Sequence, residues 1–386
     1  MTKNLLITNC RLFNSPQNEK SVEILVKDGT ITQIGKIKKN PACENILDAQ
    51  DRVIAPGFID VHIQGAGGAS VLDGTIESLQ TISQTCARFG TTSFLATTVF
   101  KPNMQNRWLE VAAEAVGSDL GGAHLLGVHL EGPFISLEKK GMISPNCICT
   151  PSLRVFNEIQ SIAGTNLKMM TIAPEFNGSL DIIRKLVDSK IIASFGHSNA
   201  SYNETLKGID AGISHVTHLF NAMGSFHHRA PGPLLAIFET EKISVQIIPD
   251  GVHFHPGVLK YLFKIIGGDR CIAITDGMQA TGLPDGIYLY DGLKYESKNG
   301  TTRYHDGTLI GTSLGLSQLV LKLKGFTDTS LDVAIKTVTE NPAKLLGIEN
   351  RKGSITVGKD ADLVILDHDY SVWATVARGK IVFQKS

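Results

Sequence analysis

Short hydrophobic runs recur along the middle of the chain, and most are separated by segments whose hydrophobic residues repeat with the period of a helix. Eight runs predict buried strands: Val53–Ile59, Thr92–Ala96, Leu125–Leu130, Lys168–Ile172, Ile191–Phe195, His215–Thr217, Val245–Ile248 and Cys271–Thr275. Amphipathic helices are predicted over Glu77–Arg88, Ser179–Ser189, Asn203–Ala211, Gly257–Ile266, Ser313–Lys324 and Leu331–Leu346. Because apolar strands joined by helices form parallel sheets, this α/β pattern favours a (β/α)8 TIM-like barrel over an open, doubly wound sheet.

The two ends of the chain show a different pattern, of short strands joined by turns. These strands are predicted at Asn4–Leu12, Val22–Val26, Thr30–Ile34, Ala361–Leu366, Thr375–Ala377 and Lys380–Phe383. Neither set buries much surface alone. We therefore expect residues 1–52 and 350–386 to form one small β-sandwich domain beside a catalytic barrel made of residues 53–349.

The charge balance narrows the partners that the protein can have. The chain of 386 residues carries 37 basic and 37 acidic side chains, and no lysine- or arginine-rich block occurs. Electrostatic attraction for nucleic acid or an anionic membrane surface is therefore weak, and we expect neither partner. The N-terminus lacks the pattern of a signal peptide and no apolar run could span a membrane, which predicts a cytoplasmic protein.

The six cysteines do not have the spacing of a disulfide framework. Cys147 and Cys149 are one residue closer than the usual pair of thiolate metal ligands, and no second pair completes a site. We expect reduced cysteines with structural roles.

Polar side chains gather just after the C-terminal ends of the predicted barrel strands. They are Asp60, His62, Glu131, His197, His218, Asp250, His253 and Asp276. In a (β/α)8 barrel all of these strand ends meet at one mouth, where the active sites of this fold lie. The placement favours the barrel and predicts a site built from several strands.

Three of these residues have the chemistry of a catalytic metal site. Glu131, His197 and His218 offer one carboxylate and two imidazoles, which can bind a divalent ion and leave one coordination position open for water. Each histidine alone could equally cap its strand, but together with Asp276 the set favours metal binding. His129 lies two residues before Glu131 and shares its face of the strand, where it could support the site.

These residues lie within motifs that resemble the amidohydrolase superfamily, and within it the N-acetylglucosamine-6-phosphate deacetylases. The resemblance covers nearly the whole chain. Its most specific motifs are HLEGPF (129–134) and THLFNAM (217–223). The other motifs are Pro56–Asp60, Gly196–Ser198, Asp250–His253, Thr275–Met278, Asp306–Leu309, Asn341–Ala343, Gly353–Ile355 and Gly358–Leu363.

The resemblance implies an enzyme of amino-sugar catabolism that hydrolyses N-acetylglucosamine 6-phosphate to glucosamine 6-phosphate and acetate. Glu131, His197 and His218 would hold a divalent ion, which lowers the pKa of a bound water toward ~7. Asp276 would accept the proton of the attacking water and deliver it to the departing amine.

The resemblance also implies how the phosphate of the substrate is bound. Backbone groups of Asn221 and Ala222 would contact it, together with the side chains of Arg229 and His253. A guanidinium matches the geometry of a phosphate group. The resemblance further implies a homodimer in which Arg229 acts across the interface.

The sequence departs from the family pattern at two places. The usual His-x-His of the first strand reads His62-Ile63-Gln64 here, and an amide oxygen is a poorer ligand than imidazole for a transition metal. We therefore expect one ion per chain, zinc with iron, cobalt or manganese as alternatives, and only a secondary role for His62 and Gln64. Ile143 stands where similar deacetylases often carry a histidine that helps to hold the substrate.

Other functions stay open from the sequence alone. One is deacetylation of N-acetylgalactosamine 6-phosphate, because a single epimeric hydroxyl is recognised by contacts that a sequence does not reveal. Another amide hydrolase on the same barrel, such as a cyclic-amide hydrolase, is a further alternative. A non-catalytic binding homologue is disfavoured because all three metal ligands and Asp276 are present.

Overall fold

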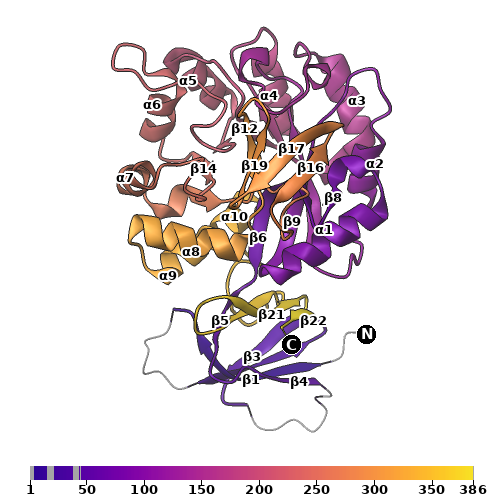
Figure 1. Cartoon of the computed structure of the whole chain (residues 1–386), viewed down its shortest axis with the longest axis vertical. Helices are drawn as coiled ribbons and strands as arrows, with labels where there is room; N and C mark the ends of the chain where they lie inside the picture. Colours follow the sequence, from indigo (N-terminus) through magenta and orange to yellow (C-terminus); the bar gives the residue numbers. More distant parts are fainter. Residues whose placement is uncertain (1–3, 15–20, 38–42, 44, 386) are drawn as a thin grey trace.

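Eight parallel strands close into a barrel in the computed structural model, which describes residues 4–14, 21–37, 43 and 45–385. In their order around the barrel they are β6 (Phe58–Ile63), β9 (Thr91–Thr98), β10 (His124–Glu131), β11 (Leu167–Ile172), β12 (Ile192–Phe195), β13 (His215–Val216), β14 (Ser244–Ile247) and β15 (Cys271–Ala273). The ring closes beyond β15, where Ile63 bridges Gly277 and the Asp276 N–H donates to the His62 carbonyl oxygen at 3.0 Å. The predicted (β/α)8 barrel is confirmed (Figure 1).

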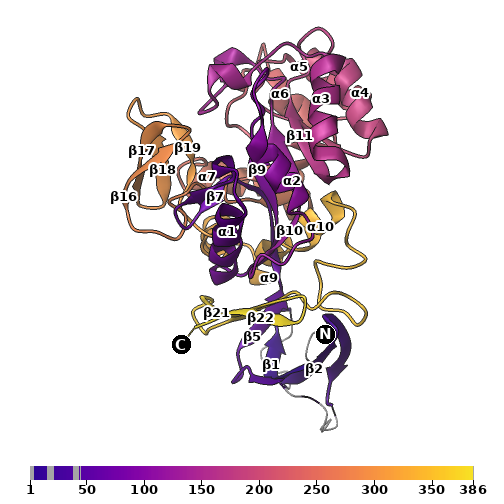
Figure 2. The same cartoon turned by 90° about the vertical axis from the view of Figure 1, so that its right-hand side faces the viewer.

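Helices surround the barrel and cover its strands (Figures 1 and 2). They are α1 (Ile76–Arg88), α2 (Arg107–Glu114), α3 (Leu153–Ala163), α4 (Ser179–Asp188), α5 (Tyr202–Ala211), α6 (Gly232–Glu239), α7 (Pro256–Ile266), α8 (Leu316–Thr327), α9 (Leu331–Lys336) and α10 (Glu340–Leu345). The helices predicted from residues 77, 179, 203 and 257 coincide with α1, α4, α5 and α7. The single helix predicted over 331–346 is wrong: it is divided into α9 and α10, with Pro342, which lacks an N–H donor, in the first turn of α10.

A capping box stabilises the N-terminus of α5, and its contribution to the stability of the protein can be measured. Ser201 Oγ accepts a hydrogen bond from the Glu204 N–H at 3.3 Å, and the Glu204 carboxylate accepts one from the Ser201 N–H at 2.8 Å. The Ser201→Ala variant leaves a helix N–H without its partner, so we expect the free energy of unfolding to fall by about 1 kcal/mol. Urea denaturation measures this loss, with Ser161→Ala in α3 as a control. Equal stability of Ser201→Ala and wild type would contradict the prediction.

Strands from both ends of the chain form one further sheet, which lies below the barrel in Figure 1. They are β1 (Leu5–Leu12), β2 (Val22–Lys27), β3 (Thr30–Gly35), β4 (Asn45–Asp48), β5 (Val53–Pro56), β20 (Leu363–Leu366), β21 (Val372–Ala377) and β22 (Lys380–Gln384). Ile7, Ile24, Ile365 and Val376 share one core between the two halves, so a separate domain made of both chain ends is confirmed. Its boundaries at residues 52 and 350 stay a prediction, and residues 1–3, 15–20, 38–42, 44 and 386 of the predicted domain lie outside the described residues.

The predicted strand Val53–Ile59 is in fact two strands that belong to different domains. β5 pairs with β1 and β20 in the sheet of the chain ends, whereas β6 begins the barrel at Phe58. Gly57 lies between them, and a Cβ atom at this position would be 2.3 Å from the Thr92 side chain. Only glycine fits this passage, and the Pro56-Gly57 pair is the sequence signal for the break between the two strands.

An antiparallel sheet is inserted between β15 and α8, and it is not among the predicted elements. Its strands are β16 (Gly286–Tyr290), β17 (Leu293–Lys298), β18 (Thr301–Tyr304) and β19 (Leu309–Thr312). The sheet projects to one side of the barrel (Figure 2). Asp291 and Gly292 join β16 to β17, and an Asp-Gly pair between alternating strands is a sequence signal for a hairpin.

Short elements complete the described chain. They are the hairpin strands β7 (Gly65–Ala66) and β8 (Ala69–Ser70) and the 3-10 turns η1 (Val71–Asp73), η2 (Leu137–Lys139), η3 (Pro145–Cys147), η4 (Gly164–Asn166) and η5 (Gly268–Arg270). Among the described helices, none has the length and apolar character needed to cross a membrane.

Candidate active site

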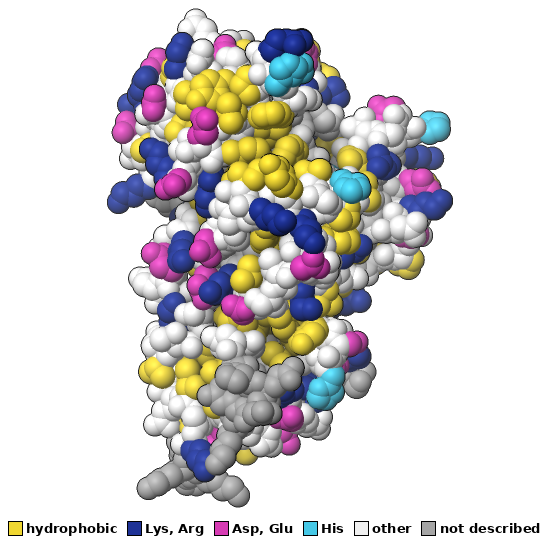
Figure 3. Space-filling view, turned by 90° about the vertical axis from the view of Figure 1, so that its left-hand side faces the viewer, with side chains coloured by type: hydrophobic (Ala, Val, Ile, Leu, Met, Phe, Trp, Pro, Cys, Tyr) yellow, Lys and Arg dark blue, Asp and Glu magenta, His cyan; other side chains and the backbone are white. Residues whose placement is uncertain are grey.

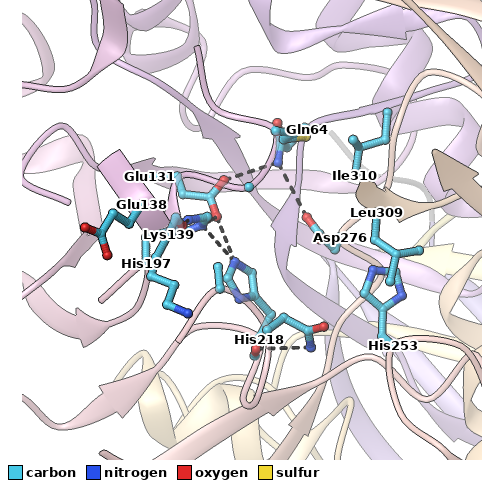
Figure 4. Close-up of a pocket in the computed structure, with 15 residues that line it drawn as sticks. Gln64, Glu131, Glu138, Lys139, His197, His218, His253, Asp276, Leu309 and Ile310 are labelled. Atoms are coloured by element: carbon cyan, nitrogen blue, oxygen red, sulfur yellow. Dashed lines mark hydrogen bonds and ion pairs between the residues drawn. The ribbon is translucent and has the colours of Figure 1, made fainter. Parts of the chain in front are cut away.

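A cavity of about 260 Å³ opens at the mouth of the barrel where the strands end (Figure 4). Its lining residues are Gln64, Glu131, Glu138, Lys139, Gly141, Met142, His197, His218, Asn221, Ala222, His253, Asp276, Leu309, Ile310 and Gly311. Of the residues predicted for the site, all except His62 and Arg229 are among them. The C-terminal face of a barrel is also where active sites of this fold occur.

Glu131, His197 and His218 converge on one point of the cavity. Glu131 Oε1 lies 2.9 Å from His197 Nε2 and 3.0 Å from His218 Nε2, and the two Nε2 atoms are 3.1 Å apart. Ligand atoms around a tetrahedral zinc ion stand ~3.3 Å apart when each is about 2.0–2.1 Å from the metal. The three side chains are buried and offer the N and O donors that a divalent ion requires, so they fit such an ion.

The protonation states of these three residues also suit metal binding. His197 Nδ1 is 2.6 Å from the Lys139 carbonyl oxygen, so Nδ1 carries the proton and the Nε2 lone pair faces the cluster. Burial lowers the pKa of His218, which favours its neutral form. Burial alone would raise the pKa of Glu131, but the surrounding histidines lower it well below its usual range and keep the carboxylate ionised.

Three residues of the site adopt backbone conformations that are unusual for residues other than glycine. The φ angles of His197, His218 and Asp276 are +49°, +24° and +45°. Such conformations are strained and tend to occur at functional sites. Each of these residues closely follows a strand end, where a sharp turn directs the side chain into the cavity.

Asp276 and His62 face each other beside Glu131, His197 and His218. Asp276 Oδ1 lies 3.2 Å from His62 Nε2, and Glu131 Oε2 lies 3.6 Å from the same nitrogen. Burial lowers the pKa of His62, but the two carboxylates outweigh it and raise the pKa to about 9. The His62 ring therefore lies against both carboxylates.

Gln64 is held at both ends of its amide group. Its Nε2 donates to Glu131 Oε2 at 3.2 Å and lies 3.5 Å from Asp276 Oδ1, while its Oε1 accepts a hydrogen bond from the Tyr290 hydroxyl at 2.6 Å. Burial raises the pKa of Tyr290 well above its usual range, and the Glu131 carboxylate adds to this shift, so the phenol keeps its proton. Tyr290 was missed in the sequence because it reaches the site from the inserted sheet.

Residues below the cavity fix the groups that line it. Asp60 accepts hydrogen bonds from the Thr275 hydroxyl at 2.6 Å and from the His62 N–H at 3.2 Å, which ties the first barrel strand to the last. His129 is fully buried, and its two ring nitrogens lie 3.2 Å from the Val61 carbonyl oxygen and 2.8 Å from the Thr171 hydroxyl. His129 therefore supports the site from behind and does not face the cavity.

The predicted phosphate-binding residues lie on the side of the cavity formed by the loops after β13 and β14. The Asn221 N–H already donates to the His218 carbonyl oxygen at 2.9 Å, whereas no acceptor among the described residues is bonded to the Ala222 N–H. His253 Nδ1 donates to Asp250 Oδ2 at 2.7 Å, which fixes its ring at the cavity wall. Lys139 adds a cation to the same cavity and was not predicted.

Arg229 lies outside the cavity of its own chain. It stands on the exposed loop before α6, and its Nη1 is 2.8 Å from His228 Nε2. Within the described chain Arg229 is thus not brought to the other predicted site residues.

Ile143 does not face the cavity either. Its side chain is 1% exposed and packs with Val99, Ile135 and Cys147, while the neighbouring Met142 lines the cavity. Since Ile143 is part of a small apolar core beneath the loop, the ligand contacts of this loop come from Lys139, Gly141 and Met142 instead.

A barrel whose mouth holds a buried carboxylate, two imidazoles and a second carboxylate is the arrangement of a metal-dependent hydrolase. A profile of the Amidohydrolase family matches residues 53–382, and the chain belongs to this family. The superfamily resemblance of the motifs is confirmed.

Within the family, the chain is similar to amino-sugar-phosphate deacetylases. It is 38% identical to the N-acetylglucosamine-6-phosphate deacetylase of Bacillus subtilis, covering 99% of this chain and 98% of the relative. It is 30% identical to the N-acetylgalactosamine-6-phosphate deacetylase of Escherichia coli O157:H7, covering 91% and 93%. The solved structure of a variant N-acetyl-D-glucosamine-6-phosphate deacetylase from Mycobacterium smegmatis, in complex with N-acetyl-D-glucosamine-6-phosphate, superposes with a TM-score of 0.89 at 28% identity, covering 99% and 100%.

Proposed function

We propose that the protein hydrolyses the acetamide of N-acetylglucosamine 6-phosphate, giving glucosamine 6-phosphate and acetate in amino-sugar catabolism. The observation that carries the proposal is the buried cluster of Glu131, His197 and His218, which faces the same cavity as Asp276 in a chain similar over its whole length to deacetylases of this substrate. The cytoplasmic location expected from the sequence stays a prediction.

The residues of the chain have distinct tasks in this reaction. Glu131, His197 and His218 would hold a divalent ion, which would polarise the acetamide carbonyl and make a bound water molecule more acidic. Asp276 takes up the proton of that water as the water attacks the carbonyl carbon. The same carboxyl group then gives the proton to the amine nitrogen as the C–N bond breaks, so that glucosamine 6-phosphate leaves as an amine.

Zinc is the ion that we propose, because two imidazoles and a carboxylate form a common zinc set. Iron, cobalt and manganese accept the same donors.

The phosphate of the substrate would be contacted by backbone groups of Asn221 and Ala222 and by the His253 ring. Their position on one wall of the cavity supports this proposal.

Arg229 would complete the phosphate site of a second copy of the chain in a homodimer. An apolar groove of about 610 Å³ between α6 and α7 adjoins its loop, lined by Phe220, Phe226, Leu235, Phe238, Glu239, Val258, Tyr261, Leu262 and Ile265. Figure 3 shows hydrophobic side chains gathered on this side of the molecule. Phe226 and Tyr261 are 55% and 64% exposed, and exposed apolar patches of this kind mark interaction surfaces.

Acetate release tests the proposed reaction directly. The metal-loaded protein should release acetate from N-acetylglucosamine 6-phosphate, with a higher kcat/KM than from N-acetylgalactosamine 6-phosphate. The second substrate is included because the relative of that name is 30% identical to the chain. A preference for the galactosamine epimer would replace the proposed substrate, and no acetate from either sugar would refute the proposed function.

The number of ions per chain is a separate prediction. We expect a metal-to-protein ratio near one after dialysis against metal-free buffer, because Gln64 presents its amide nitrogen to the carboxylates and His62 Nε2 already lies 3.2 Å from Asp276 Oδ1. Elemental analysis measures the ratio. Gln64→His should raise the ratio when metal is in excess, since imidazole is the stronger ligand. The exposed Gln105→His is the control, and a wild-type ratio near two would contradict the prediction.

A further inference from the structure

The inserted sheet brings one buried phenol against the side chain of Gln64. Tyr290 ends β16, and its side chain is 4% exposed. Its hydroxyl donates to Gln64 Oε1 at 2.6 Å, a short distance for a hydrogen bond between two oxygens. The oxygen end of the amide is therefore occupied by a group of the protein.

The nitrogen end of the same amide faces two carboxylates. Gln64 Nε2 lies 3.2 Å from Glu131 Oε2 and 3.5 Å from Asp276 Oδ1 (Figure 4). Ionised carboxylates only accept hydrogen bonds. A reversed amide would place its oxygen against both carboxylates and would leave the buried phenol proton without its acceptor, which is unfavourable. The hydrogen bond from Tyr290 thus selects one of the two amide orientations.

The hydrogen bond from Gln64 Nε2 leaves the two oxygens of the Glu131 carboxylate with different partners. Its Oε1 faces His197 and His218 at 2.9 and 3.0 Å, whereas its Oε2 accepts the hydrogen bond from Gln64. A carboxylate whose second oxygen accepts an amide hydrogen bond keeps a fixed orientation toward its first set of partners.

The orientation of the amide decides whether an ion can bind beside His62. An amide nitrogen has no free lone pair for a metal, so an ion there would need Gln64 Oε1. We propose that Tyr290 is a positioning residue that holds the Gln64 amide with its N–H groups toward Glu131 and Asp276. In this orientation the Gln64 amide donates hydrogen bonds to the carboxylates and offers no ligand atom to a second ion, so a second ion does not bind there. The inference rests on the proposed metal-dependent function and assigns the inserted sheet a part in it.

A metal titration of the substrate-free protein tests the proposal. The Tyr290→Phe variant keeps the ring and removes only the hydroxyl. Titration of the metal-free protein with Co²⁺, followed by its visible absorption, should show one tight equivalent in wild type. In Tyr290→Phe a second equivalent should bind about fivefold tighter than any second ion in wild type, the change expected for one lost hydrogen bond.

Two further variants make the titration specific. Tyr295 is also a buried tyrosine of the inserted sheet, but its hydroxyl contacts the Ala280 N–H at 3.1 Å and Gln279 Oε1 at 3.3 Å. Tyr295→Phe should therefore titrate like wild type. Gln64→His should bind a second equivalent both alone and combined with Tyr290→Phe, because an imidazole can bind an ion without any contact to the phenol.

Three outcomes would overturn the proposal. They are an unchanged titration of Tyr290→Phe, an equal gain in Tyr295→Phe, and a Gln64→His protein that still binds only one ion. The last would show that the pocket excludes a second ion without Tyr290. Because these titrations use no substrate, their failure is distinct from failure of the proposed reaction, which appears as a wild-type protein that releases no acetate.

Discussion

The Asp276→Asn variant should retain its fold and its bound metal but lose at least ~10²-fold in kcat, the typical contribution of a placed acid–base group. Asparagine has nearly the same size as aspartate, so the packing around the cavity is kept. It cannot accept a proton from water or return one to the amine. The large loss is therefore expected in kcat and not in the affinity for substrate.

Steady-state kinetics and elemental analysis of the same preparations test this result. Asp181→Asn is a matched control, because Asp181 lies on the exposed face of α4 and pairs with Arg184 at 2.8 Å. The control should keep wild-type turnover. Asp276→Asn with full metal content and near-wild-type kcat would remove Asp276 from the proposed mechanism.

Arg229→Ala should weaken the use of the phosphorylated substrate by roughly 1.5–3 kcal/mol in kcat/KM, the range for a hydrogen bond to a charged group. An unphosphorylated acetylated sugar should be affected far less. The comparison of the two sugars separates loss of phosphate binding from damage to the catalytic groups. Arg184→Ala, which removes another exposed arginine, is the control.

Mixed dimers test whether Arg229 acts in the partner subunit. In a dimer of one Arg229→Ala and one Asp276→Asn chain, one of the two sites would contain both an intact arginine and an intact aspartate. Activity should therefore exceed that of either parent. Verified subunit exchange without any recovery would place Arg229 in its own subunit's site or outside every site.

The barrel and the convergence of Glu131, His197 and His218 are the features that the sequence predicts well, and both for the same reason. Barrel strands are buried on both faces, so β10 and β11 read largely as hydrophobic runs. A polar residue directly after such a run must lie at the mouth. Glu131, His197 and His218 were found in this way, although they are far apart in the chain.

Helices and strands whose hydrophobic residues follow no clear period are not predicted from the sequence. α6 is apolar without interruption from Pro233 to Phe238 and therefore shows no amphipathic stripe, whereas the Pro56-Gly57 pair before Phe58 is a sequence signal that could have marked the change of domain. The α3 sequence does have a helical period and Ser152 as its N-cap, a signal that could have identified it. Tyr290 could be suspected only from the Asp291-Gly292 hairpin, because its contact with Gln64 spans 226 residues.

The pairing of β5 with β20 has a consequence for how the protein is made. Pro56 is paired with Leu363, so this sheet cannot be completed until Leu363 has left the ribosome. The barrel strands pair with their neighbours in sequence and can assemble earlier through more local contacts. During that time Ile54 and the rest of the first strands lack the cover that β20 and β21 later provide. The later strands β20 and β21 therefore shield β1 and β5 from water and from pairing with other chains.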